Sequence, residues 1–266
     1  MKIKAEQKGF FEIRCIFLPV ISYMALHIAI SKIFYWCLSN EAEFVCGEIA
    51  TCILAPFVVL WYNKITKNKA PVLPSKATLT APIIQEDSTI CDKVLPKNKL
   101  NSESIKIFAS LTLLSIFLAV SSAFALIYFN LAENEIKFNF ISFLCVVLAT
   151  PISEELIYRG FVLYRSKNFY GPFTAIAISS VLFAIAHPSV LSIFVSLFAG
   201  FIFCMACLKY NCVATSIYVH SLVNLLAFSK AIYSLPLSVY ILCIIGLLAF
   251  SVSYIRNFYL SLKLEK

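Results

Sequence analysis

The chain has 266 residues, of which 61% are hydrophobic and 14% charged, and its mean hydropathy is +0.87. A soluble domain carries about 25% charged residues, so this composition excludes an ordinary soluble protein. The formal net charge of +8 does not indicate nucleic-acid binding, because the basic residues lie between apolar runs, where they would meet lipid headgroups. We therefore expect an all-α, polytopic membrane protein.

Apolar runs long enough to cross a bilayer recur along the whole chain. A spanning helix needs about 20 mainly apolar residues, and within lipid a helix satisfies all its own backbone hydrogen bonds. The sequence therefore predicts eight helices, at residues 15–37, 45–62, 107–130, 138–165, 172–187, 189–208, 212–229 and 232–255.

The distribution of positive charge predicts that both termini lie in the cytoplasm. With eight spans and the N-terminus inside, all but three of the 22 Lys and Arg residues fall in cytoplasmic segments; the exceptions are Lys32, Lys137 and Lys230. Three regions follow from this topology. They are two N-terminal helices in residues 1–62, a proline-containing polar cytoplasmic linker in 63–106, and a six-helix catalytic membrane domain in 107–256.

Glu154 and Glu155 are the acidic residues that fall well inside a predicted span. An ionisable side chain at such a place usually faces the protein interior or a water-filled cavity. Glu155 and Arg159 are four residues apart and share one helix face, so an ion pair between them is expected. Successive residues are rotated by about 100° around a helix. We therefore expect Glu154 to face a cavity while Arg159 holds Glu155.

His187 is placed to meet Glu154 across a helical hairpin. Phe183 and His187 share one face of the predicted helix 172–187. The chain turns near residues 171–172, and Glu154 precedes that turn by as many residues as His187 follows it. In an antiparallel pair of regular helices, the two side chains would lie at the same depth.

His220 and Asn224 share one face of the predicted helix 212–229. His220 lies about ten residues beyond the preceding cytoplasmic turn, which is roughly 15 Å along its helix. That depth is compatible with the depth of Glu154 and His187. These four residues are therefore predicted to line one cavity that opens toward the cytoplasm.

Three short motifs, each in its own predicted helix, carry a family resemblance. In chain order they are E-E-x-x-x-R (Glu154, Glu155 and Arg159), F-x-x-x-H (Phe183 and His187) and H-x-x-x-N (His220 and Asn224). Together they resemble the CAAX prenyl endopeptidase and bacteriocin-processing family of intramembrane proteases (the Abi family), which includes type II CAAX prenyl endopeptidases and lysostaphin-resistance proteins. The resemblance covers residues 138–230. It implies a membrane-embedded endopeptidase in which the first glutamate of the pair is the essential one.

Peptide hydrolysis needs an activated water and hydrogen-bond donors where the oxyanion develops. A low-dielectric cavity disfavours the charged form of a glutamate, which makes it a better base near neutral pH. We assign Glu154 as the base and His187 as the residue that positions the water, with His220 and Asn224 as donors to the oxyanion. Glu155 and Arg159 would support the site, and Phe183 would form a wall of the cavity. The expected substrate is a CAAX-like, prenylated or other membrane-associated peptide or protein, cut near its C-terminus.

The sequence leaves the involvement of a metal open. Two histidines with a carboxylate are a plausible Zn²⁺ set, here Glu154, His187 and His220. However, the H-E-x-x-H motif is absent, and the resembled family has been described both as metalloproteases and as metal-independent glutamate proteases. Cys204 and Cys207 form a C-x-x-C without further ligands, so these thiols are expected to pack as small hydrophobes.

Two other functions are open to the same residues. The first is a non-proteolytic membrane immunity protein or scaffold, in which the polar motifs only hold helices together. The second is a transporter that uses Glu154 as a proton relay, but transporters usually show inverted repeats and glycine- or proline-broken helices. With 6 glycines and no internal repeat, the transporter is the weakest of the three. His27 belongs to no motif and is expected to serve packing.

Overall fold

The computed structural model describes residues 5–37, 49–50, 54, 57–58, 61, 102–128, 140–187 and 189–264, and every regular element in these ranges is helical. The predicted all-α class is therefore confirmed for the described residues. The elements are α1 (Ala5–Cys37), α4 (Ser102–Tyr128), α5 (Phe140–Leu144), η1 (Cys145–Ala149), α6 (Thr150–Glu155), η2 (Leu156–Leu163), α7 (Tyr164–Tyr170), α8 (Pro172–Ala184), α9 (Val190–Tyr210), α10 (Val213–Ala227), η3 (Lys230–Tyr233) and α11 (Leu237–Leu264).

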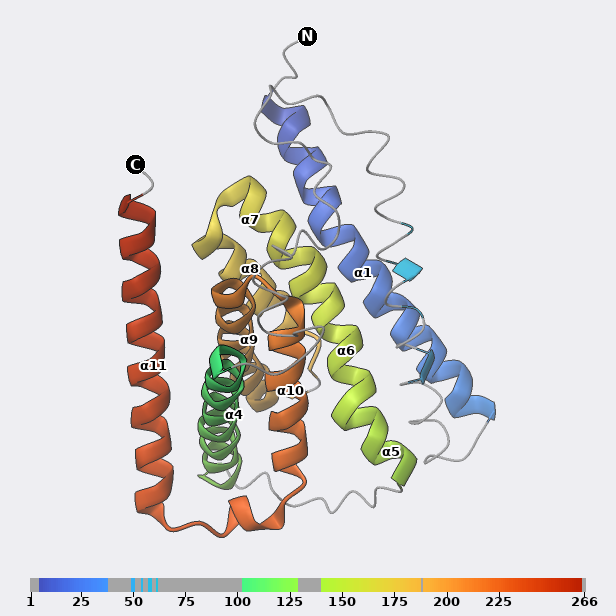
Figure 1. The fold of residues 1–266 in the computed structure, drawn as a ribbon. Helices are drawn as coiled ribbons and strands as arrows, with labels where there is room; N and C mark the ends of the chain where they lie inside the picture. The colour runs from blue at the N-terminus through green and yellow to red at the C-terminus, as the bar shows by residue number, and fades with distance from the viewer. Residues whose placement is uncertain are drawn as a thin grey trace.

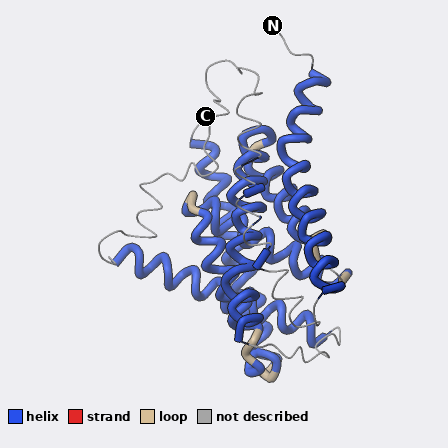
Figure 2. The backbone as a smooth tube through the Cα atoms, turned by 90° about the vertical axis from the view of Figure 1, so that its right-hand side faces the viewer, coloured by secondary structure: helices blue, strands red, loops and turns tan. Residues whose placement is uncertain are grey.

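The turns of the helical bundle gather at its two ends. The start of α1, the α7–α8 turn, the α9–α10 turn and the end of α11 lie at one end, while the end of α1, the start of α5 and η3 lie at the other (Figure 1). The view along a perpendicular direction also places the start of α1 and the end of α11 at the same end (Figure 2). The number of spans and their orientation in the membrane remain predictions.

Several predicted helix boundaries were wrong. The helix expected at 15–37 begins at Ala5, and the one expected at 232–255 begins only at Leu237, after the 3-10 turn η3, and continues to Leu264. The predicted helix 45–62 and most of the predicted linker 63–106 lie outside the described residues. The last five linker residues belong to α4, which begins at Ser102.

The predicted helix 138–165 is a continuous helical run from Phe140 to Tyr170, but it is not a regular α-helix. Two π-helical segments, η1 and η2, interrupt it on either side of the six-residue α6. Because π-helical hydrogen bonds join residues five apart, these segments change the rotation per residue that a regular helix would have. Such segments occur often at functional sites, and α6 carries Glu154 and Glu155.

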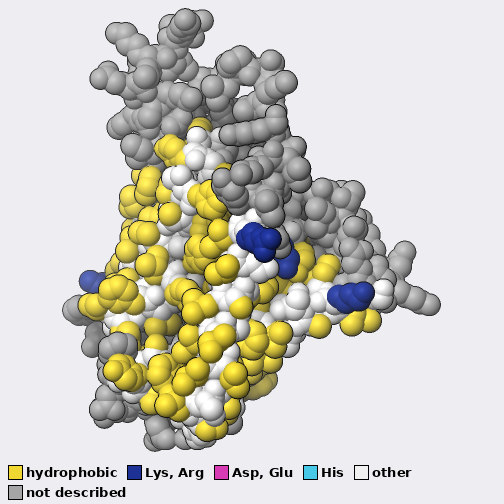
Figure 3. Space-filling model, turned by 90° about the vertical axis from the view of Figure 1, so that its left-hand side faces the viewer, with side chains coloured by type: hydrophobic (Ala, Val, Ile, Leu, Met, Phe, Trp, Pro, Cys, Tyr) yellow, Lys and Arg dark blue, Asp and Glu magenta, His cyan; other side chains and the backbone are white. Residues whose placement is uncertain are grey.

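The interior and the surface of the bundle are both apolar. A buried cluster joins α1, α4, η2 and the helices that follow, and includes Tyr23, Leu114, Tyr158 and Phe203. The face seen in Figure 3 is covered largely by hydrophobic side chains. On α11, Leu242 is 66% exposed. Soluble monomers rarely expose continuous apolar surfaces of this kind, so the outward faces suit contact with lipid.

Two described helices are long and apolar enough to cross a membrane, Ile105–Tyr128 and Val190–Tyr210. Shorter apolar segments lie at Ile16–Ile30, Pro172–Ala184, Val213–Ala227 and Leu237–Ser253. In Figure 1, α10 lies beside the run that carries α6, and α8 and α9 lie behind α10; α10 contacts α6, while α8 and α9 contact η2. These helices surround the acidic pair.

Candidate active site

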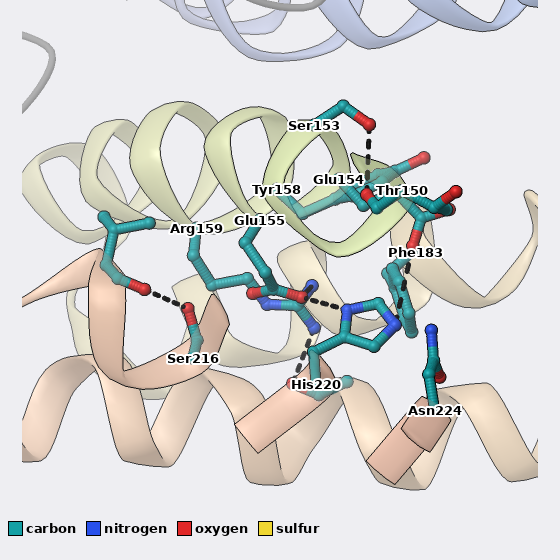
Figure 4. A network of polar contacts seen from close by, with 12 residues as sticks. Thr150, Ser153, Glu154, Glu155, Tyr158, Arg159, Phe183, Ser216, His220 and Asn224 are labelled. Carbon is teal, nitrogen blue, oxygen red and sulfur yellow. Dashed lines mark hydrogen bonds and ion pairs between the residues drawn. The ribbon is translucent and has the colours of Figure 1, made fainter. Parts of the chain in front are cut away.

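Glu155 is the centre of a buried polar network between α6, η2 and α10 (Figure 4). Its Oε1 lies 2.9 Å from Arg159 Nη1, and neither side chain has measurable exposure. The ion pair expected from their spacing is therefore present. The same Oε1 lies 2.9 Å from His220 Nδ1. Since an ionised carboxylate can only accept hydrogen bonds, we assign the Nδ1 hydrogen of His220 to this contact.

Arg159 is held from two further directions. Its Nη2 donates to the backbone carbonyl of Gly200 over 3.1 Å. Its guanidinium carbon lies 4.5 Å from the centre of the Phe183 ring and 5.2 Å from that of Phe203. A cation within about 6 Å of an aromatic ring centre is attracted to the ring. The buried charge of Arg159 thus has an ionic partner, a carbonyl acceptor and two aromatic neighbours.

Gly200 allows α9 to approach this network closely. A Cβ atom at this position would lie 3.1 Å from Phe183 Cδ1, 3.2 Å from Ser180 Cα and 3.3 Å from Arg159 Nη2. These separations are tighter than ordinary van der Waals contact, so only glycine fits without a shift of its neighbours. Small residues at helix interfaces permit such close approach in membranes.

His220 connects the buried ion pair to the more accessible Glu154. The His220 ring stacks on Phe203, with centres 4.6 Å apart and planes inclined by 22°. Its Nε2 lies 3.8 Å from Glu154 Oε2, and the Glu154 side chain is 21% exposed whereas that of His220 is 7% exposed. Glu154 is therefore the carboxylate at the open edge of the site, and Glu155 is the enclosed one, as the sequence predicted.

Phe183 lies between the two histidines of the site. Its ring meets His187 edge to face at 4.9 Å and His220 in the same manner at 5.8 Å. His187 Nδ1 is 3.1 Å from the carbonyl oxygen of Phe183. A carbonyl accepts only, so Nδ1 is again the nitrogen that carries hydrogen, and the Nε2 of a neutral His187 ring is left as an acceptor.

The position of His187 differs from the prediction in one respect. The helix expected at 172–187 ends at Ala184, and His187 follows in a turn in which its backbone N–H donates to the Ala184 carbonyl over 3.0 Å. Pro188 comes next in the sequence, and the residue before a proline is disfavoured in the helical region. His187 therefore lies beyond the helix end, and the depth calculated from two regular helices does not apply.

Asn224 is hydrogen-bonded to the helical run Phe140–Tyr170, which the π-helical segments interrupt. Its Nδ2 donates to the carbonyl oxygen of Val146, in the π-helical segment η1, over 2.9 Å. An amide nitrogen carries two hydrogens, so this bond uses one of them and fixes the direction of the other. Asn224 was predicted as an oxyanion donor, and no pattern in the sequence indicated its hydrogen bond to Val146.

Other contributors to the site were also missed from the sequence. Phe203 stacks on His220, and the hydroxyl of Ser179 donates to the Tyr158 carbonyl over 2.8 Å. The one available signal concerned Gly200: the chain has only 6 glycines, and a glycine within an apolar span often marks a close helix contact. Phe203 and Ser179 carry no signal that separates them from ordinary packing residues.

The structure does not assemble the predicted metal set. Within the described part of the chain, no three or more His, Cys, Asp or Glu side chains group so that they could hold a metal ion. Glu154, His187 and His220 as placed here do not fit a Zn²⁺ site, and no step is derived through one.

Cys204 and Cys207 are fully buried in α9 as free thiols. Cys204 Sγ lies 3.8 Å from the hydroxyl oxygen of Ser180, and Cys207 Sγ donates to the Tyr164 hydroxyl over 3.7 Å. Both belong to an apolar cluster with Leu163 and Val213. This environment is that of small packing residues, as expected.

Comparison with known proteins points to one family. Residues 136–226, about a third of the chain, match the family model described as type II CAAX prenyl endopeptidase Rce1-like. No curated protein and no solved structure matches the chain significantly. The matched segment contains Glu154, Glu155, Arg159, His187, His220 and Asn224, together with their aromatic and backbone partners. Residues 136–226 are therefore similar to the Rce1-like type II CAAX prenyl endopeptidase family.

Proposed function

We propose that this protein is a membrane-embedded endopeptidase in which Glu154 activates a water molecule for attack on a peptide bond. The observation that carries this proposal is the contrast within the acidic pair. Glu155 is enclosed and hydrogen-bonded to Arg159 and His220, whereas Glu154 is partly exposed and faces the Nε2 atom of His220. A carboxylate at the edge of a low-dielectric site, next to a fixed imidazole, is suited to general base catalysis.

His187 would orient the attacking water. In its neutral form its Nε2 accepts a hydrogen bond, because Nδ1–H donates to the Phe183 carbonyl. A water that gives one hydrogen to Glu154 and the other to His187 directs an oxygen lone pair toward the substrate carbonyl. Fixing the nucleophile in this way supplies part of the rate enhancement through orientation.

His220 and Asn224 would stabilise the oxyanion. Donation from His220 Nε2 requires a ring with both nitrogens protonated. The charges of His220 and Arg159 then balance those of Glu154 and Glu155, so these four buried or half-buried groups are neutral together. Asn224 contributes the N–H that is not used by Val146. Preorganised donors of this kind are often the largest single contribution to catalysis.

Glu154 accepts one proton and later gives one back, so the reaction is balanced. Glu154 takes a proton from water as the hydroxide oxygen bonds to the carbonyl carbon. The tetrahedral intermediate then collapses, the carbon–nitrogen bond breaks, and the leaving nitrogen takes the proton from Glu154. The products are a new carboxyl terminus and a free amine, and Glu154 returns to its starting state.

The family assignment supports a substrate that is a peptide or protein at the membrane, cut near its C-terminus at a CAAX-like sequence. The predicted topology would open the site toward the cytoplasm, where such termini are found. The full-length chain in phosphatidylcholine vesicles can be tested with quenched-fluorescence peptides that end in a C-a-a-X sequence, with and without a farnesyl group on the cysteine.

Glu154→Gln retains the shape of the side chain but removes the base, so cleavage should fall by about 10²- to 10⁴-fold. Ser153→Ala is the matched control in the same turn, because the Ser153 hydroxyl donates to the carbonyls of Ala149 and Thr150 in the same helical run; its cleavage rate should match that of the wild type. Equal cleavage by Glu154→Gln and the wild type would contradict the proposed role of Glu154. If the wild type cleaves neither peptide, the proposed substrate class is wrong.

A further inference from the structure

Tyr158 presents a buried hydroxyl next to Glu154 that has no assigned role. The side chain is 1% exposed, and its hydroxyl oxygen has no hydrogen-bond partner among the described residues. Tyr158 lies one helical turn after Glu154, and Figure 4 shows the two side chains next to each other.

The Tyr158 ring is fixed independently of its hydroxyl. It packs edge to face on Phe183, with centres 5.4 Å apart, and belongs to the main apolar cluster with Tyr23 of α1. The Tyr158 carbonyl is held by the Ser179 hydroxyl. A phenylalanine would make the same ring contacts, and it would avoid burying a polar atom without a partner, which is unfavourable. Packing therefore explains the ring but not the oxygen.

We propose that the Tyr158 hydroxyl is a positioning group for Glu154, donating a hydrogen bond to its carboxylate or to the water that it activates. This inference rests on the proposed function. A phenol can donate a hydrogen bond, which an ionised carboxylate cannot. It would restrain the Glu154 carboxylate from η2, while His220 of α10 lies with its Nε2 3.8 Å from Glu154 Oε2.

The test compares two tyrosine substitutions by cleavage kinetics and by thermal unfolding in detergent. Tyr158→Phe should lower kcat by about tenfold to a hundredfold, which is the contribution of a hydrogen bond to a charged group. KM should be unchanged, since the hydroxyl acts on Glu154 and not on substrate binding. The melting temperature should stay close to that of the wild type, which separates an effect on Glu154 from a loss of the fold.

Tyr218→Phe is the matched control, because the Tyr218 hydroxyl is 2.8 Å from the Thr112 hydroxyl, away from the acidic pair. It should lower the melting temperature and leave kcat unchanged. The inference is overturned if Tyr158→Phe retains wild-type kcat, or if it fails to fold, since the hydroxyl would then be structural. Glu154→Gln is measured alongside. An inactive Glu154→Gln with a fully active Tyr158→Phe rejects only this inference, whereas an active Glu154→Gln rejects the proposed function and this inference with it.

Discussion

Glu155 and His220 are 65 positions apart in the chain and are joined by a buried contact of 2.9 Å between Oε1 and Nδ1. The same carboxylate oxygen binds Arg159, so one buried atom connects the charge of η2 to the imidazole of α10. The second glutamate of the pair is thus more than the partner of an arginine. It sets which nitrogen of His220 faces Glu154.

Replacing Glu155 by Gln should destabilise the protein and reduce cleavage. Arg159 would keep a charge at a fully buried position without its ionic partner, and breaking a buried pair from one side costs about 3–5 kcal/mol. Thermal unfolding in detergent measures this loss. The double variant Glu155→Gln, Arg159→Gln should recover part of the melting temperature but not the activity, because His220 still lacks its carboxylate. An unchanged melting temperature in the single variant would show that the pair does not stabilise the fold.

Gly200→Ala should impair the site without changing any polar side chain. The added methyl group would press on Phe183, on the backbone of Ser180 and on Arg159 at 3.1–3.3 Å, and overpacking of this kind typically costs about 1–3 kcal/mol. The displaced guanidinium should also lower the cleavage rate. Both effects are measured on the purified chain by thermal unfolding and peptide cleavage.

Gly160→Ala is the matched control for this substitution. Its Cβ would meet its nearest neighbours, Glu155 O and Val213 Cγ2, at 3.8 Å, which is ordinary contact. It should therefore leave cleavage unchanged, although Gly160 is next to Arg159 in the chain. If Gly200→Ala and Gly160→Ala behave alike, the close approach of α9 is not what holds Arg159 in place.

The sequence was sufficient for features that depend on composition and on short spacing. Apolar runs predicted the helices, and the four-residue spacing of Glu155 and Arg159 predicted their ion pair. The π-helical segments were not predicted, because a change of backbone hydrogen bonding leaves no periodic signal over five to eight residues. The helix end before His187 was missed although Pro188 marks a boundary there.

Contacts between helices were the other part that the sequence could not supply. His220 was predicted to face Glu154, but its closest carboxylate is Glu155, because the packing of α10 against α6 decides which of two adjacent side chains it meets. Stacking of Phe203 on His220 depends in the same way on tertiary packing. Such contacts follow from the relative rotation of whole helices, which a single sequence does not determine.

Asn224 offers a test of whether its anchor at Val146 matters for the site. Asn224→Ala removes a hydrogen bond that contributes about 0.5–1.5 kcal/mol, and it removes the proposed oxyanion donor, which should lower kcat by about 10²- to 10³-fold. Asn224→Asp has nearly the same shape, but its ionised carboxylate cannot donate and would face the Val146 carbonyl oxygen. It should therefore be the less stable of the two variants, with a cleavage rate no higher than that of Asn224→Ala. An Asn224→Asp protein with wild-type stability and activity would show that neither amide hydrogen is needed, and the oxyanion would then depend on His220 alone.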